Sequence, residues 1–132
     1  MKFAFTRIVT KDVVALTKFY RELTGITPKI LNEAYVEFPA AGSALAISSQ
    51  KTMDLHGSRA ASAASNRSVV LDFQVEDVDR ELARIRNLVK EIVLEPINQP
   101  WGNRSMMFRD PDGNLINFYA PIREIGEQGE RK

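Results

Sequence analysis

The sequence repeats one pattern of elements, and this repeat is what most constrains the fold. Lys11-Asp12-Val13 and Glu76-Asp77-Val78 stand at equivalent places, each after an apolar strand pattern and before a helical one. Aspartate is a common first residue of helices because its carboxylate accepts a hydrogen bond from a backbone N–H of the first turn. Three short strand patterns follow each helix. We therefore predict two consecutive βαβββ modules.

In the first module we predict a strand at about residues 2–9 and a helix that starts after Asp12 and ends at Gly25. Glycine is suited to that end because it adopts the left-handed backbone conformation of a helix C-terminus. The apolar residues of the helix fall at helical spacing: Val13, Leu16, Phe19, Tyr20 and Leu23. Three strands should follow, near residues 27–31, 34–39 and 43–48.

In the second module we predict a strand at 68–75 and a helix from Asp77 to about Lys90. Three strands follow, near residues 92–96, 103–109 and 114–121. The last two are joined by Asp110-Pro111-Asp112-Gly113-Asn114, whose turn chemistry is explicit. Pro111 fixes its own φ, Asp110 can cap the turn with its side chain, and Gly113 tolerates φ > 0. Residues 103–120 therefore form a hairpin.

The length of 132 residues predicts a single domain. We divide it into module 1 at about 1–49, a linker at 50–66, module 2 at about 67–121, and a frayed tail at 122–132. The linker has no clean period and can form a mobile flap or a short helix. We favour the flap, because its second half, Ala60–Ser65, consists of small residues.

Composition excludes several classes of function. The net charge is +1 and the charged residues are interspersed, so we expect no nucleic acid partner. No apolar run approaches 18 residues and the chain does not open with a signal-peptide pattern, so we expect no membrane association and a cytoplasmic location. The absence of cysteine excludes disulfides and thiolate catalysis.

Several strings of the sequence resemble the vicinal oxygen chelate superfamily, which comprises glyoxalase I, extradiol dioxygenases, fosfomycin-resistance enzymes and bleomycin-resistance proteins. The strings are Trp101-Gly102, Arg104, Phe108 to Asn114, Ile8 to Val13, Lys18-Phe19-Tyr20, Leu23-Thr24-Gly25 and Leu71 to Asp79. The resemblance covers roughly residues 3–120. It implies an α+β fold in which tandem βαβββ modules form curved mixed sheets around a concave pocket, with the helices outside.

Strand alternation predicts which side chains face that pocket. Val69, Leu71, Phe73 and Val75 form the apolar side of one strand, and Ile116 and Phe118 that of the last. The alternate residues then face the pocket. The first strand follows the register that the resemblance implies, which also places Val9 inward. We predict these ligand-binding residues: Phe5, Arg7, Ala46, Val70, Asp72, Gln74, Trp101, Ser105, Met107, Asn117 and Tyr119.

The resemblance also implies where a metal would bind. Metal-using members hold one divalent ion with His, Glu or Gln side chains from the first and last strands of each module. Those positions correspond to Phe5, Ala46, Val70 and Asn117, which offer one weak neutral ligand between them. The single histidine, His56, lies in the linker, where we expect a solvated side chain. We therefore predict no metal and no cofactor.

Four predicted pocket residues have alternative roles. Asp72 is a weak candidate for a catalytic base, and we favour the alternative that it pairs with Arg7 or Gln74. Arg7 can bind a carboxylate or phosphate, or form an internal salt bridge. Trp101 can stack on a planar ligand, or act as a lid over the core. Ser105 has no histidine near it in the sequence, and such serines usually bond backbone or ligand.

Two functions remain open. The first is a metal-free small-molecule binding protein that resembles bleomycin-resistance proteins and holds its ligand in a groove formed with a second subunit. The alternative is a glyoxalase-like enzyme, a lyase, isomerase or dioxygenase, with an atypical metal site or metal-independent acid–base chemistry. We favour binding. We also predict a homodimer, because the resemblance implies pockets that two subunits complete and because short sheets with open edges need covering.

Overall fold

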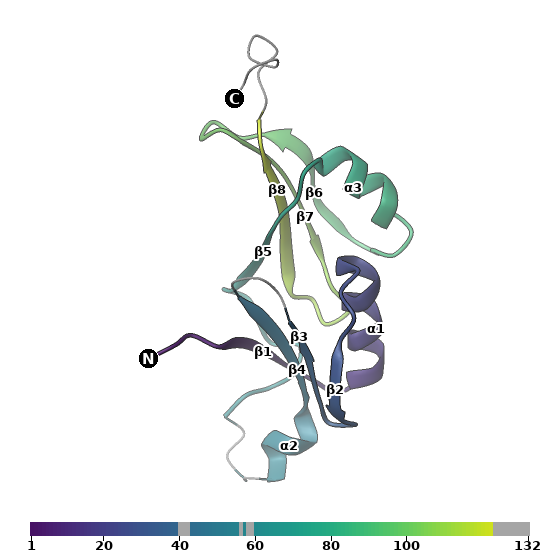
Figure 1. Ribbon diagram of the computed structural model, residues 1–132, viewed down its shortest axis with the longest axis vertical. Coiled ribbons are helices and arrows are strands. Elements are labelled where there is room, and N and C mark those ends of the chain that lie inside the picture. The colour runs from purple at the N-terminus through teal and green to yellow at the C-terminus, as the bar shows by residue number, and fades with distance from the viewer. Residues whose placement is uncertain (40–42, 56, 58–59, 123–132) are drawn as a thin grey trace. The chain divides into compact units, whose positions relative to one another are not determined.

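The chain forms the two expected βαβββ modules (Figure 1) in a computed structural model that describes residues 1–39, 43–55, 57 and 60–122. The first module consists of β1 (Phe5–Thr10), α1 (Val13–Thr24), β2 (Lys29–Asn32), β3 (Tyr35–Phe38) and β4 (Ala44–Ser49), and α2 (Gln50–Leu55) follows it. The second consists of β5 (Val70–Gln74), α3 (Val78–Ile85), β6 (Ile92–Asn98), β7 (Asn103–Arg109) and β8 (Leu115–Pro121). The α+β fold is as predicted.

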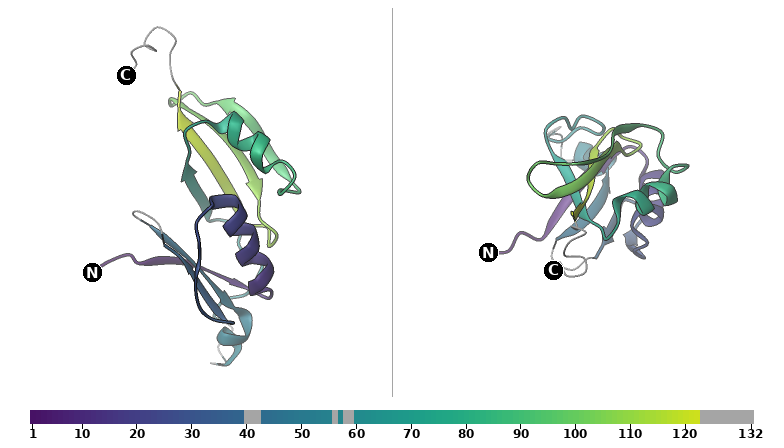
Figure 2. Two further views of the ribbon diagram at one scale, coloured as in Figure 1. Left: turned by 45° about the vertical axis from the view of Figure 1, so that its right-hand side comes forward. Right: turned by 90° about the horizontal axis from the view of Figure 1, so that it is seen from above.

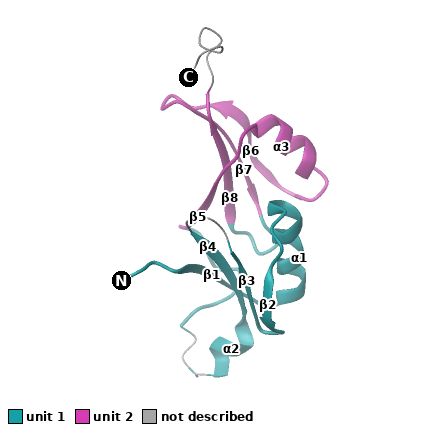
Figure 3. Cartoon of the chain, in the orientation of Figure 1, with its two compact units in different colours: residues 1–67, 110–114 teal, residues 68–109, 115–132 magenta. Residues whose placement is uncertain are grey.

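The chain forms two compact units, and each unit consists of two separate segments of the sequence (Figure 3). Unit 1 contains residues 1–67 together with the turn 110–114, and unit 2 contains residues 68–109 and the segment from 115 onward. The turn between β7 and β8 is therefore part of the first unit. The predicted tail lies outside the described residues from position 123. We describe each unit by itself.

Both units have the same sheet topology. The strand order is β1-β4-β3-β2 in unit 1 and β5-β8-β7-β6 in unit 2. In each unit the first and last strands are parallel and the other pairs are antiparallel. Figure 2 shows each of the helices α1 and α3 against one face of its own sheet, as a parallel connection between two strands requires. The predicted repeat is confirmed.

Helix α1 begins and ends as the sequence predicts. The side chain of Asp12 accepts a hydrogen bond from the backbone N of Ala15 at 3.0 Å. Gly25 has φ = 72° and its N–H donates to the carbonyl of Arg21, which closes the helix. The buried face of the helix packs against β3 and β4. Its buried residues are Leu16, Thr17, Phe19, Tyr20 and Leu23.

Helix α3 begins as predicted but ends earlier. Asp77 accepts a hydrogen bond from the backbone N of Arg80 at 3.1 Å. The helix stops at Ile85, whereas we predicted it to continue to about Lys90. The carbonyl of Ile85 accepts bonds from both Leu88 and Val89, so the last turn tightens and ends the regular helix. Buried Val78, Leu82 and Ile85 anchor it on β7 and β8.

Two other boundaries differ from the prediction. Strand β1 starts at Phe5 rather than near residue 2, because its partner β4 begins at Ala44, opposite Phe5. The segment predicted as an unstructured linker begins with helix α2, so the prediction was wrong over residues 50–55. Gln50 ties the following chain to this helix, since its side chain bonds the carbonyl of Ala61 at 3.0 Å and the N–H of Ala63 at 2.7 Å.

Each unit has a cluster of three aromatic rings in its core. In unit 1, Tyr20 contacts the rings of Phe19 and Phe38 at centroid distances of 5.2 and 6.4 Å. In unit 2, Phe118 contacts Phe73 and Phe108 at 5.9 and 5.0 Å. All four contacts are edge-on, a favourable arrangement for aromatic pairs. Phe19 and Tyr20 belong to α1, and the four strand residues Phe38, Phe73, Phe108 and Phe118 lie on the helix-facing sides of their sheets. Among the described residues, no helix is long and apolar enough to cross a bilayer.

Candidate functional site

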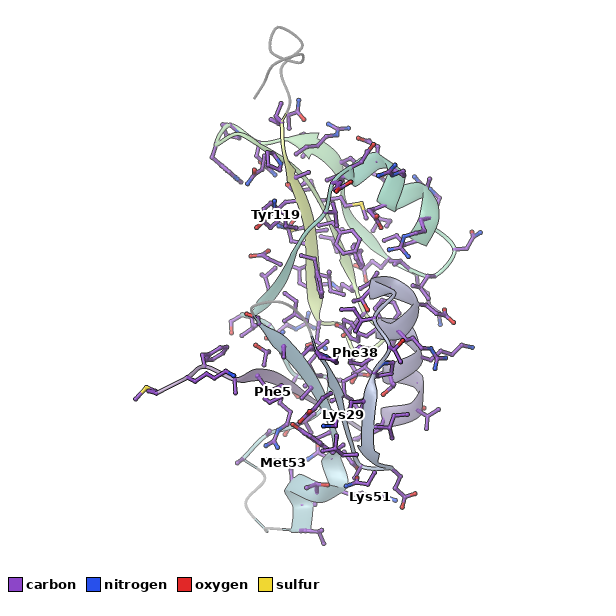
Figure 4. All side chains as sticks on the ribbon, viewed as in Figure 1. Phe5, Lys29, Phe38, Lys51, Met53 and Tyr119 are labelled. Atoms are coloured by element: carbon purple, nitrogen blue, oxygen red, sulfur yellow. The ribbon has the colours of Figure 1, made fainter. Side chains whose placement is uncertain are left out.

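In unit 1 the face of the sheet opposite α1 carries the predicted residues. Tyr20 of α1 contacts Phe38, which fixes the helix-facing side of the sheet. Arg7 pairs with Ala46 on the other side, and Phe5 is 38% exposed there. Figure 4 shows Phe5 and Phe38 on β1 and β3, respectively. Ala46 is fully buried by its longer neighbours. We call this surface the open face of unit 1.

Arg7 lies on this open face without a carboxylate partner among the described residues. Its Nη2 is 4.0 Å from the sulfur of Met53 in α2, a weak contact. Tyr35 and Glu37, on β3, are hydrogen-bonded to each other. The pKa of Tyr35 is raised by burial and by Glu37, and lowered by the positive charge of Arg7. Of the two alternatives for Arg7, an internal salt bridge is therefore not what the described residues form.

In unit 2 the corresponding face is built from β5, β8 and β7. Arg104 bonds Asp79 of α3, which fixes the helix-facing side of β7. Side chains of the opposite parity therefore form the open face of unit 2, and all the predicted strand residues of this unit lie on it (Figure 4 labels Tyr119). They are Val70, Asp72, Gln74, Ser105, Met107, Asn117 and Tyr119. The predicted alternation is confirmed for these strands.

Asp72 and Asn117 form a pair at the centre of this face. They are opposite each other in the parallel register of β5 and β8. Nδ2 of Asn117 donates a hydrogen bond to Oδ1 of Asp72 at 3.0 Å. Asn117 Oδ1 is buried and has no hydrogen-bond partner among the described residues. The partner of Asp72 in the structure is thus Asn117, a residue that the sequence placed on the same face but did not connect to it.

The loop between β6 and β7 carries Trp101, which is 71% exposed. The lid alternative for Trp101 is therefore wrong within the single chain, because a lid over the core would be buried. Ser105, just beyond the loop, is 4% exposed and accepts a hydrogen bond from Nε2 of Gln99 at 3.1 Å. Ser105 is thus held by the side chain of Gln99 in that loop, whereas we expected it to bond backbone or ligand.

A hollow of about 540 Å³ lies elsewhere in unit 2, beside the start of α3. Its lining includes none of the predicted binding residues. Arg104 crosses it and bonds both oxygens of Asp79, at 2.8 and 3.0 Å, and Oδ1 of Asn98 at 3.1 Å. The hydrogen bond from Arg104 lowers the pKa of Asp79. Asp77 is used as the helix cap, so the main polar groups of this hollow already satisfy one another, and we do not assign it a ligand.

A buried polar network in unit 1 was only half predicted. Asp110 caps its turn as expected, because its Oδ1 accepts bonds from the backbone N of Asp112 and Asn114 at 2.8 and 2.9 Å. Its Oδ2 accepts a bond from the hydroxyl of Tyr20 at 2.6 Å and from Nδ2 of Asn114 at 2.8 Å. Asp110 is 5% exposed. The helical spacing predicted that Tyr20 is apolar and inward, but gave no sign of its partner.

The acidic side chain of Asp112 lies next to this network. Burial raises its pKa most, the charges of Asp110 and Asp12 raise it further, and a hydrogen bond with Thr10 lowers it. Burial and the neighbouring carboxylate of Asp110 likewise raise the pKa of Tyr20 well above its ordinary value. The turn thus concentrates negative charge in unit 1, and the four hydrogen bonds that Asp110 accepts hold the turn together and join it to α1.

The fold and the order of elements are matched by a family model that covers residues 2–118, described as the glyoxalase/bleomycin resistance protein/dioxygenase superfamily. The chain belongs to this superfamily. The resemblance of the sequence strings is therefore confirmed. The curated proteins contain no match to the chain.

Solved structures agree with this assignment. A family enzyme from Burkholderia phytofirmans PsJN is 16% identical with a TM-score of 0.82, covering 92% of this chain and all of the other. A protein of unknown function from Agrobacterium tumefaciens C58 is 27% identical with a TM-score of 0.78, covering 92% and 95%. A lactoylglutathione lyase from Agrobacterium tumefaciens is 22% identical with a TM-score of 0.65, covering 90% and 92%. At these identities the first and third show the fold alone.

The residues at the superfamily's metal positions do not fit a divalent transition metal. Phe5 and Val70 are partly exposed on the two open faces, and Ala46 is buried. None of their side chains has a lone pair to donate. Asn117 has one carbonyl oxygen, whereas a catalytic metal usually has about three protein ligands. In the described part of the chain no three His, Cys, Asp or Glu residues gather as a metal site would require; His56 lies outside that part.

Proposed function

We propose that the protein binds a small amphipathic or aromatic molecule without a metal, on the open faces of its sheets. The observation that carries the proposal is the composition of these faces. In unit 2, apolar Val70, Met107 and Leu115 surround a few polar groups of fixed position. Small-molecule sites commonly combine apolar walls with a small number of placed polar groups. The superfamily's metal positions on the same faces carry side chains that contact organic groups rather than ions.

We further propose that the functional form is a homodimer. Large apolar side chains are exposed in the single chain, and a second copy would remove them from water. They include Ile30, Leu31, Val69, Val93, Ile97 and Trp101. The outermost strands of both sheets also have unpaired edges. Light scattering at micromolar concentration should give twice the chain mass of 14.9 kDa, and a particle of the single-chain mass would contradict the dimer.

The enzyme alternative rests on Asp72. A carboxylate held by an amide could accept a proton from a bound substrate. No described residue is arranged as a partner acid or nucleophile beside it, so binding remains the better-supported function. The lactoylglutathione lyase shares the fold at 22% identity and does not bear on this choice.

A thermal-shift screen tests the proposal directly. Protein dialysed against a chelator would be screened with aromatic metabolites, each with and without added zinc, nickel, manganese or iron(II). A ligand that binds the folded state raises the melting temperature by mass action. We expect stabilisation by an organic compound alone, accompanied by a change in Trp101 fluorescence. Stabilisation or turnover that requires one of the metals would contradict the proposal and favour the enzyme.

A matched pair of variants locates the binding. Trp101→Ala should weaken binding of any compound found in the screen by about 1–3 kcal/mol, the range for an aromatic anchor. Val14→Ala is the control, because Val14 is similarly exposed, at 79%, but lies on α1, which packs on the opposite face of its own sheet. Equal affinities in both variants would mean that Trp101 does not line the site.

A further inference from the structure

The side-chain oxygen of Asn117, Oδ1, bears on the chemical class of the ligand. This atom is buried and has no donor partner among the described residues. Buried polar atoms are almost always hydrogen-bonded, so one without a partner calls for an explanation. The atom lies on the open face of unit 2, where the neighbour across β7 is Met107. A thioether has no hydrogen to donate, so Met107 cannot satisfy it.

Hydrogen-bond chemistry fixes which end of the Asn117 side-chain amide faces Asp72. The two ends of an asparagine side chain look alike, and their assignment depends on the hydrogen-bond network. Here one end lies 3.0 Å from Oδ1 of Asp72. An ionised carboxylate only accepts hydrogen bonds, so the NH₂ end of Asn117 must face Asp72. The carbonyl end is therefore the one without a partner.

The charge of Asp72 is also without a cationic partner. Asp72 is exposed and forms no ion pair within the described chain. It is the sole acidic residue of β5, β7 and β8. The two arginines of β7 are engaged elsewhere, since Arg104 bonds Asp79 and Arg109 lies 3.8 Å from Glu91. The centre of the face thus offers a negative charge and an adjacent carbonyl, and both only accept hydrogen bonds.

Apolar side chains surround this pair. Leu115 and Tyr119 flank Asn117 along β8, and Val70 flanks Asp72 along β5, all with the same strand parity. Met107 is opposite Asn117 in the register of β7 and β8, and its flexible thioether can adjust to a bound group. A group that suits this arrangement carries several N–H donors and a positive charge, and is attached to an apolar body.

We infer that the open face of unit 2 recognises a primary ammonium group on an aromatic or aliphatic body, with Asp72 and Asn117 Oδ1 as its two acceptors. The inference rests on the proposed binding function and names the class of ligand. The ammonium places one N–H on the carboxylate of Asp72 and another on the amide oxygen. The apolar body lies over Val70, Leu115 and Met107. A carboxylate on the same body is repelled by Asp72.

Three compounds with the same ring system test the inference. They are 1-naphthylmethylamine, 1-naphthalenemethanol and 1-naphthaleneacetic acid, which present an ammonium, a hydroxyl and a carboxylate at neutral pH. Binding is measured by titration calorimetry with the full chain at low salt. We expect the amine to bind at least about tenfold more tightly than the acid, with the alcohol between them. Equal or tighter binding of the acid overturns the inference.

Variants assign the effect to the two acceptors. Asp72→Asn should weaken the amine about tenfold and leave the alcohol nearly unchanged, because only the charge is removed. Glu95→Gln is the matched control, since it removes one negative charge from the same unit near Arg86 and away from the open face. Asn117→Ala should weaken both the amine and the alcohol. Circular dichroism establishes that each variant is folded, and Asp72→Asn, at an exposed position, decides the result if Asn117→Ala is not.

The outcomes separate this inference from the proposed function. An unchanged amine affinity in Asp72→Asn overturns the inference even if the amine binds. If none of the three naphthyl compounds saturates the protein, but the thermal-shift screen finds another metal-free ligand, the inference fails and the binding function stands. If neither experiment finds a ligand, both fail.

Discussion

The two units share a topology but close their cores in different ways. In unit 2 the central ring is Phe118, which contacts the rings of Phe73 and Phe108. In unit 1 the central ring is Tyr20, whose hydroxyl bonds Asp110 from the far end of the sequence. A cluster of apolar rings tolerates many arrangements of similar volume, whereas a buried hydroxyl needs one partner in one place. The comparison suggests that unit 1 has the more specific core and unit 2 the more adaptable one.

The open faces of the two units differ in the sign of the charge that each presents. Unit 1 presents a cation, Arg7, without a carboxylate partner in the described chain, and unit 2 presents the carboxylate of Asp72. The backbone repeat is thus preserved while the polar groups on it have diverged. Sheet topology depends on which residues are apolar, and it tolerates almost any polar side chain on the solvent-facing side. Function can therefore differ between two copies of one scaffold.

The largest expected effect on stability follows from removing the carboxylate of Asp110, the hydrogen-bond acceptor of the network in unit 1. Asp110→Ala leaves the Tyr20 hydroxyl and three N–H groups of the turn without their partner. Four donors lose their acceptor and each buried unsatisfied donor costs about 1–3 kcal/mol, so we expect a loss of at least about 4 kcal/mol in the free energy of unfolding, by urea titration. Asp112→Ala, in the same turn, is the control and should cost less than about 1 kcal/mol. A loss as small as that for Asp110→Ala would mean that unit 1 does not depend on the network.

A reciprocal exchange of one hydroxyl tests the difference between the two ring clusters. Tyr20→Phe should cost about 1–2 kcal/mol, because Asp110 loses one of its donors. Phe118→Tyr should cost about 1–3 kcal/mol, because it places a hydroxyl at a buried position beside the rings of Phe73 and Phe108. Thermal and urea unfolding measure both. A neutral Phe118→Tyr would show that unit 2 can hydrate or rearrange around the group, which would confirm its adaptability and refute the stated cost.

The smallest effects have opposite signs in the two units and depend on pH. Asp112 in unit 1 has a raised pKa, so its contribution to stability is present in acid and is lost as pH rises from its ordinary value of 3.8 through the folded value. Asp79 in unit 2 has a lowered pKa, so its contribution is present above 3.8 and is lost as pH falls through the folded value.

Replacing each of these carboxyls with an amide measures whether its charge stabilises or destabilises the fold. At pH 7 we expect Asp112→Asn to gain and Asp79→Asn to lose about 0.5 kcal/mol, because solvent screens both partly exposed groups. As pH falls, the Asp112→Asn difference should disappear first, because the pKa of Asp112 is raised, and the Asp79→Asn difference should persist to lower pH, because the pKa of Asp79 lies below 3.8. Urea titrations at pH 3, 5 and 7 provide the measurement. The same sign for both variants at pH 7 would contradict the assigned causes of the shifts.

Much of this structure could be predicted because it is encoded locally. The caps Asp12, Asp77 and Gly25 act on backbone groups within four residues of themselves, so their roles follow from neighbouring sequence. Strand alternation placed Asp72 and Asn117 on one face, because successive residues of a strand point to opposite sides. The metal positions Phe5, Ala46, Val70 and Asn117 came from the family resemblance, and the absence of a metal there stays a prediction.

The missed features depend on residues far apart in sequence. Helix α2 was not predicted because its residues follow no apolar period. Its residue Gln50 instead bonds residues up to 13 positions away, at Ala63. Trp101 could not be placed, because a loop residue flanked by proline and glycine has no periodic pattern to reveal its burial. The bond between Asp72 and Asn117 joins residues 45 positions apart and depends on the register of β5 with β8.

By itself, the sequence determined the repeat, the helix caps, the turn at 110–114 and the side of each strand that is apolar, since all of these depend on spacing within a few residues. Only the tertiary structure decided that this turn completes unit 1, where Tyr20 meets Asp110 across 90 positions. The physical reason is that periodicity states which face of an element avoids water, but a hydrogen bond between two buried polar groups exists only when docking brings them within about 3 Å.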